Sequence, residues 1–76
     1  AAPFVDYKTR LQEIIQKNPE ERVVYVLVSA EGPDHDKKFV VEVHLNSNVI
    51  GRGVSRSKKG AEQAAAHEAL SLMGEG

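Results

Sequence analysis

The sequence has 76 residues, enough for one small domain, and its 41% apolar and 28% charged residues exclude the composition of a disordered segment. It contains no cysteine, which excludes disulfide frameworks, thiolate zinc sites and thiol catalysis. The formal net charge of −1 indicates no general affinity for nucleic acid, and no apolar run approaches membrane-spanning length, so we expect no membrane partner and a cytoplasmic setting.

A first helix is predicted over residues 7–17, because apolar side chains recur there at helical spacing and Asp6 can cap the N-terminus. Pro19 marks its end. The apolar residues form one stripe for burial. The opposite face carries a polar row, which consists of Thr9, Gln12, Glu13 and Gln16. Such a face is most often only solvated, but most members of this row are uncharged hydrogen-bonding groups.

β-branched residues and alternation predict three strands, at residues 23–30, 38–46 and 49–54. The second strand alternates most clearly, with one apolar and one polar side, which fits a sheet with one buried and one solvated face. The segment Asn46-Ser47-Asn48 suits a tight hairpin between the second and third strands, because Asn tolerates positive φ.

A second, alanine-rich helix is predicted after Ser57, whose side-chain oxygen can accept from unpaired N–H groups of the first turn. Its apolar face is predicted to comprise Ala61, Ala64, Ala65, Ala69, Leu72 and Met73. These side chains are mostly small, so the helix backbone can lie close to a sheet. Gly51 and Gly53 are assigned to a bend of the backbone into this helix.

The start of the second helix lies in a basic stretch, since residues 43–61 contain four Lys or Arg side chains and no acidic residue. Lys58 and Lys59 add positive charge to a helix N-terminus that already favours anions. Lysine is unfavourable there on dipole grounds, which favours phosphate binding over a merely solvated surface. Arg56 fits phosphate contact and plain turn surface equally well.

The predicted order is helix, three-stranded antiparallel meander, helix, in one domain over residues 1–76 with a core of about 6–73. Both helices need cover for their apolar faces, and the sheet offers one apolar face. We therefore expect an α+β fold, α-β-β-β-α, with both helices packed on one face of the sheet. The first helix, the loop at residues 32–36 and the start of the second helix would then share one surface.

Motifs in this order resemble the double-stranded-RNA-binding domain, and most closely the C-terminal domain of bacterial ribonuclease III. They are Asp6-Tyr7-Lys8-Thr9-x-Leu11-Gln12-Glu13, Tyr25, Gly32-Pro33-x-His35, Phe39-x-Val41-x-Val43, Gly51-x-Gly53 and Ser57-Lys58-Lys59-x-Ala61-Glu62-Gln63-x-Ala65-Ala66. Each motif is weak alone, but together they cover nearly the whole chain. The Asp-Tyr-Lys-Thr opening favours the ribonuclease over other owners of this domain.

The resemblance implies three regions that contact A-form RNA. The first helix would lie in a minor groove, where 2′-hydroxyls and base edges would meet Thr9, Gln12, Glu13 and Gln16. His35 would enter the next minor groove, while Lys58 and Lys59 would contact phosphates across the major groove between them. Arg56 and Ser57, beside the lysines, complete the predicted RNA-binding residues. Such a domain covers ~16 base pairs and recognises shape more than sequence.

Two positions depart from the family pattern. Glu62 stands where many members have a third basic residue, which predicts a weaker phosphate clamp, although ribonuclease III members often carry glutamate there. Gly60 stands where a glutamate or glutamine would close a capping box with Ser57. Glycine also lowers helix propensity by about 1 kcal/mol relative to alanine, so we expect a frayed helix start.

The resemblance implies a binding domain without catalysis of its own, which holds double-stranded RNA for a nuclease domain that this chain does not contain. Magnesium is expected only for that nuclease domain, and no cofactor for this one. We expect the domain to be monomeric and the full-length parent to be a homodimer through its nuclease domain. The alternative is a protein–protein interaction module of the same fold with weak or no RNA binding, against which the lysine pair and the polar row both argue.

Overall fold

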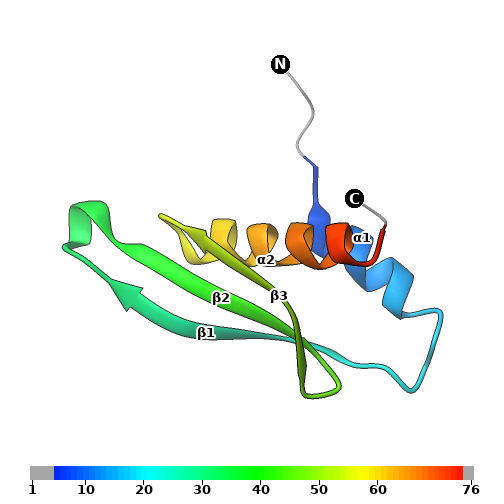
Figure 1. Ribbon diagram of the computed structural model, residues 1–76. Coiled ribbons are helices and arrows are strands. Elements are labelled where there is room, and N and C mark those ends of the chain that lie inside the picture. Colours follow the sequence, from blue (N-terminus) through cyan, green and yellow to red (C-terminus); the bar gives the residue numbers. More distant parts are fainter. Residues whose placement is uncertain (1–4, 75–76) are drawn as a thin grey trace.

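The order of elements along the chain is that predicted, helix, three strands, helix, in a computed structural model that describes residues 5–74 (Figure 1). Residues 1–4 and 75–76 of the predicted domain lie outside the described residues. The elements are α1 (Tyr7–Ile15), β1 (Val23–Glu31), the short 3-10 helix η1 (Asp34–Asp36), β2 (Lys38–Leu45), β3 (Asn48–Ser55) and α2 (Lys58–Leu72). Their ends differ from the predicted ends by at most two residues, and the α+β class is confirmed.

The three strands form one antiparallel sheet in the order β1-β2-β3, so the central strand is β2. The hairpin between β2 and β3 turns through Asn46 and Ser47, with φ of 50° and 76°. Two consecutive residues with positive φ give the turn a twist that matches the strands it joins, which explains the choice of Asn. A bulge interrupts the pairing of β1 with β2 between Leu27 and Ser29.

Helix α2 packs against β3 and β2, and α1 packs beside α2 (Figure 1). The core between these layers contains the buried apolar side chains Leu11, Ile15, Val41, Val43, Ala61, Ala65, Ala66, Ala69 and Leu70. Both helices therefore bury their apolar faces on the same side of the sheet, as predicted. The far part of β1 has less cover, and Leu27 there is 43% exposed.

The predicted apolar face of α2 is partly wrong. Leu72 is 75% exposed and Met73 is 42% exposed, whereas Ala66 and Leu70 are buried. Ala61, Ala65 and Ala69 form one buried row at intervals of one helical turn, and Ala66 and Leu70 form a second row beside it. The second row is required because α2 packs against α1 as well as the sheet, which the helical period alone does not reveal.

Gly51 and Gly53 bring the backbones of β3 and α2 together, so their assignment to a bend is wrong. A Cβ atom at Gly51 would collide with the carbonyl oxygen of Ala65, and one at Gly53 with that of Ala61. Neither glycine has an unusual φ, so space, not backbone freedom, demands glycine. The two glycines fix α2 directly on the strand.

Candidate nucleic-acid interface

The polar row on α1 faces solvent, as predicted. Asp6 caps the helix, because the Thr9 N–H donates to its Oδ1 at 3.1 Å. The side chains in the row are all exposed: Thr9, Gln12, Glu13 and Gln16. Gln16 is the C-cap residue of α1, so the row runs along the whole helix. A hydroxyl, two amides and a carboxylate are thus available to an external ligand.

The predicted N-cap of α2 is present. Ser57 is the N-cap, and its Oγ accepts from the Gly60 N–H at 2.9 Å. Lys58 and Lys59 are the first two helical residues, and both are exposed. A Cβ atom at Gly60 would collide with Oγ of Ser55 and would lie 2.9 Å from Oγ of Ser57, so glycine leaves room for both hydroxyls. Glycine at this position therefore lowers the helix propensity but allows the residues of the cap to pack closely.

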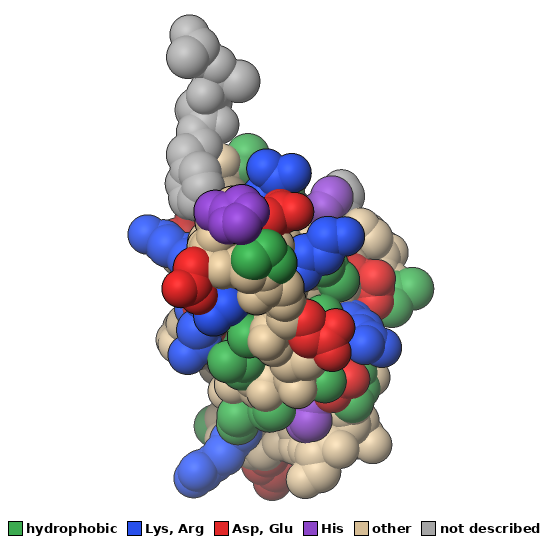
Figure 2. Space-filling model, turned by 90° about the vertical axis from the view of Figure 1, so that its left-hand side faces the viewer, with side chains coloured by type: hydrophobic (Ala, Val, Ile, Leu, Met, Phe, Trp, Pro, Cys, Tyr) green, Lys and Arg blue, Asp and Glu red, His purple; other side chains and the backbone are tan. Residues whose placement is uncertain are grey.

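His35 lies in η1, in the exposed connection between β1 and β2. Gly32 opens this connection with a φ of 104°, and a Cβ atom there would lie 2.7 Å from the carbonyl oxygen of Asp36. Such a backbone strongly favours glycine. The connection projects from the end of the sheet that also carries the start of α2, and on this end cationic and acidic side chains alternate over the surface (Figures 1 and 2).

Arg56 links two of the predicted regions. Its Nε lies 3.6 Å from Oδ1 of Asp36, so the turn before α2 is paired with the connection that carries His35. The two side chains are 84% and 53% exposed, and a pair so open to water contributes at most about 1 kcal/mol. Arg56 therefore has a protein partner that leaves most of its surface accessible.

A shallow hollow joins the other two regions. Its walls come from α1, its cap residue and the first turns of α2, and they are Asp6, Lys8, Thr9, Gln12, Lys59 and Gln63. Two members of the polar row thus share one depression with one of the two lysines. The structure thus brings Thr9, Gln12 and Lys59 together, whereas Glu13, Gln16 and Lys58 do not line this hollow. His35 lies outside it, in the connection that the Asp36–Arg56 pair joins to the turn before α2.

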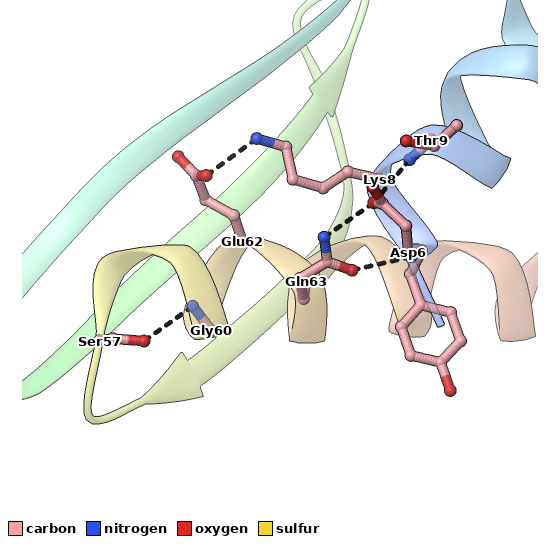
Figure 3. Close-up of polar contacts among 8 residues, drawn as sticks. Asp6, Lys8, Thr9, Ser57, Gly60, Glu62 and Gln63 are labelled. Atoms are coloured by element: carbon pink, nitrogen blue, oxygen red, sulfur yellow. Dashed lines mark hydrogen bonds and ion pairs between the residues drawn. The ribbon is translucent and has the colours of Figure 1, made fainter. Parts of the chain in front are cut away.

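Sequence reasoning missed the groups that hold α1 against α2 (Figure 3). Gln63 accepts the Tyr7 N–H at 2.7 Å and donates from Nε2 to Asp6 Oδ1 at 2.9 Å. Lys8 Nζ lies 2.9 Å from Oε1 of Glu62. The partners are separated by more than fifty positions, and no local pattern could have paired them.

Glu62 is therefore an internal ion-pair partner in place of a third phosphate ligand. Its side chain is 18% exposed, and Lys8 is placed between it and the ring of Tyr25, whose centroid lies 4.7 Å from Nζ. The negative charge that departs from the family pattern is balanced within the fold. Burial, followed by the negative charges of Glu62 and Asp6, raises the pKa of Tyr25 to about 12, so this phenol stays neutral.

The carboxylate of Asp6 stays ionised over the physiological range. Hydrogen bonds from the Gln63 side chain and then from Thr9 lower its pKa from the usual 3.8 to about 2. An ionised carboxylate has acceptor capacity for both donors at once. Asp6 therefore both caps α1 and forms one of the bonds that join α1 to α2.

Across residues 5–74, no three His, Asp or Glu side chains gather in a way that could hold a metal ion. Neither helix of this part of the chain has the length and apolarity needed to cross a membrane.

The fold and the surface described above are those of an RNA-binding domain, and comparison identifies the family. The family model described as the double-stranded RNA binding motif matches residues 7–73, and the chain belongs to this family. The match takes up nearly the whole chain, so the chain is the RNA-binding domain alone and carries no nuclease domain. The predicted resemblance and the predicted class of function, binding of double-stranded RNA, are confirmed.

Curated relatives are bacterial ribonucleases. Ribonuclease 3 of Clostridium perfringens is 51% identical over 72 residues, which are 95% of this chain and 30% of that protein. Ribonuclease 3 of Caldanaerobacter subterraneus is 52% identical over 71 residues, 93% of this chain and 31% of that protein. The chain thus spans about 30% of the length of the curated relatives it matches.

Solved structures show the same arrangement. Dicer from Pichia stipitis matches with a TM-score of 0.71 at 32% identity, over 87% of this chain and 32% of that one. The second dsRBD of DRB4 matches with a TM-score of 0.66 at 34% identity, over 95% of this chain and 100% of that one.

Proposed function

We propose that this chain is the substrate-holding domain of a ribonuclease III, which recognises an RNA duplex by its shape. The hollow that joins Thr9 and Gln12 to Lys59 is the observation that carries the proposal, because it sets groups suited to a 2′-hydroxyl beside a group suited to a phosphate. In an A-form duplex the shallow minor groove presents 2′-hydroxyls, and phosphates border it. Such a surface fits RNA better than DNA.

The row on α1 supplies the discrimination. A 2′-hydroxyl both donates and accepts, so the Gln12 and Gln16 amides and the Thr9 hydroxyl can each serve it from either side. Glu13 only accepts, and it is tolerated near phosphates when it faces a hydroxyl donor. DNA lacks these hydroxyls, so the same row gains less from a DNA duplex.

The start of α2 supplies most of the affinity. Lys58 and Lys59 are exposed ammonium groups at a helix N-terminus, where free N–H groups and the helix dipole also favour an anion. Ser57 uses an acceptor of its hydroxyl in the cap, and the hydroxyl proton is left to donate to a phosphate. Each phosphate contact releases counterions, so binding weakens as salt rises.

His35 and Arg56 extend the contact at the other end. His35 is exposed at the tip of the connection between β1 and β2 and can reach a second minor groove. Arg56 keeps that connection near the lysines through Asp36 and presents its outer N–H groups to the backbone of the duplex. The three regions together then follow one face of a duplex.

A titration of the chain with a perfect RNA duplex and with a DNA duplex of equal length tests the proposal. We expect affinity in the micromolar range or tighter for RNA, a clear preference over DNA, and a steep decrease with salt. Fluorescence anisotropy at several salt concentrations measures all three. A folded chain without affinity for the RNA duplex would instead support the protein–protein interaction module.

The proposal extends to a longer protein that has the same domain organisation as ribonuclease III. There a separate nuclease domain cleaves the duplex with magnesium and forms a homodimer, while this domain acts as a monomeric arm that holds substrate. A cytoplasmic setting belongs to the same proposal.

A further inference from the structure

Two consecutive residues of α2 hold three consecutive residues at the start of α1 (Figure 3). Gln63 Oε1 accepts the Tyr7 N–H at 2.7 Å, and Gln63 Nε2 donates to Asp6 Oδ1 at 2.9 Å. Beside it, Glu62 Oε1 pairs with Lys8 Nζ at 2.9 Å. We call these five residues, Asp6, Tyr7, Lys8, Glu62 and Gln63, the clasp.

The amide of Gln63 is matched to two different needs. The Tyr7 N–H is in the first turn of α1 and has no partner within the helix, so it requires an acceptor. Asp6 is an ionised carboxylate that already accepts from Thr9, so it requires a further donor. An amide offers an acceptor and a donor on one carbon atom. A glutamate at this position would instead bring a second negative charge against Asp6.

The clasp lies between the two halves of the binding surface. Gln63 is one helical turn after Lys59, and it bonds to the carboxylate that caps the α1 turn containing Thr9. All four of these residues line the same hollow. The Gln63 amide therefore links Lys59, the proposed phosphate contact, to the turn that contains Thr9, the first residue of the polar row.

We propose that Gln63, supported by the Lys8–Glu62 ion pair, is a positioning residue that sets the interval between the row on α1 and the lysines on α2. This inference rests on the proposed function. A duplex presents phosphates and 2′-hydroxyls at fixed separations, so both sets of contacts form together only when this interval is correct. Loss of the clasp then reduces the preference for RNA over DNA more than it reduces phosphate-driven affinity.

Other contacts keep α1 docked when the clasp is broken. Leu11, Ile15 and Leu70 are buried in the shared core. The rings of Tyr7 and His67 are also stacked, with centroids 4.3 Å apart. Breaking the clasp therefore shifts the first turn of α1 without releasing the helix, and the effect on recognition can be separated from unfolding.

The test replaces Gln63→Glu and measures binding to RNA and DNA duplexes. We expect the RNA-over-DNA preference to fall about three- to tenfold, which corresponds to the loss of one or two hydrogen bonds. Adding Asp6→Asn restores the preference, because the new amide at position 6 can donate to the new carboxylate at position 63. Its carbonyl oxygen can still accept the Thr9 N–H and cap α1. Gln63→Met, which has similar length and no charge, shows the same direction of change if Gln63→Glu folds poorly.

Glu68→Ala is the matched control. Glu68 is on the same helix and accepts a backbone N–H, that of Arg52 at 3.1 Å, but it belongs to the β3 side of the molecule. Its removal leaves the preference unchanged. The inference is overturned if folded Gln63→Glu and Gln63→Met keep the wild-type preference, or if Asp6→Asn fails to restore it. A wild-type chain with no preference for RNA would overturn the proposed function itself.

Discussion

The junction of α1 with α2 and the η1 connection are held in place in different ways. At the junction, the two helices share a buried apolar core, a ring stack and the clasp. The side chains of the ion pair in the clasp are only 18% and 35% exposed. At η1 the link to the rest of the binding surface is one ion pair at 3.6 Å between largely exposed groups. The start of α1 and the start of α2 are thus firmly joined, whereas the connection that carries His35 has a weaker link to the turn before α2. On the proposed function, His35 could then adjust to an irregular duplex.

The largest effect is expected at the fixed part. Lys58→Ala with Lys59→Ala removes two phosphate contacts, so affinity for all duplexes falls and the salt slope flattens by about one to two units. Anisotropy titrations over a range of salt measure the slope. Lys17→Ala with Arg22→Ala, which removes the same charge from elsewhere, is the control. An unchanged slope in the first variant would remove the lysines from the interface.

The next effect separates recognition from attraction. Gln12→Ala removes an amide from the row, so we expect affinity for RNA to fall by about 1 kcal/mol, with little change for DNA. Paired titrations with duplexes of equal length measure the difference. Glu20→Ala, an exposed change beyond α1, serves as control. Equal losses on both duplexes would contradict a 2′-hydroxyl contact.

A smaller effect is expected at the weakly held part. Arg56→Ala removes the proposed phosphate contact together with the ion pair to Asp36, so affinity for RNA should fall by about twofold to fivefold. Asp36→Asn weakens the pair and keeps the arginine. If the pair matters for holding His35, Asp36→Asn will reduce affinity in the same direction; an increase would show that Arg56 serves RNA better when released.

The smallest effect concerns stability in acid. The pKa of Asp6 is about 2 in the folded chain against 3.8 as usual, so its ionised form stabilises the fold above pH 3.8, and this contribution disappears as the pH falls toward 2. Thermal unfolding followed by circular dichroism should show the wild type more stable than Asp6→Asn at neutral pH. The gap should close between these two pH values, and a gap independent of pH would contradict the assignment.

The sequence predicted what depends on neighbours along the chain. The helix cap at Asp6, the hairpin at Asn46 and the cap at Ser57 all follow from local chemistry, and each is present. The exposed row on α1 followed from helical period, because a stripe of buried residues defines its opposite face.

What the sequence did not predict depends on partners distant in the chain. The bonds of Gln63 to Asp6 and Tyr7 and the Lys8–Glu62 pair arise only when two helices meet. Leu72 was assigned to the core because its period fits, but the helix runs beyond its cover at that point. The position of α2 on β3 depends on the lack of side chains at Gly51 and Gly53, and the periodicity of apolar residues does not reveal such close backbone contacts.

The glycines of β3 have a consequence for the turn that follows them. Two residues of a strand advance about 6.6 Å and four residues of a helix about 6 Å, so the contact of Gly53 with Ala61 recurs at Gly51 with Ala65. This double contact orients the helix without help from the turn at residues 56–57. An insertion of one residue into that turn would bulge outward, while Lys58 and Lys59 would keep their direction in space.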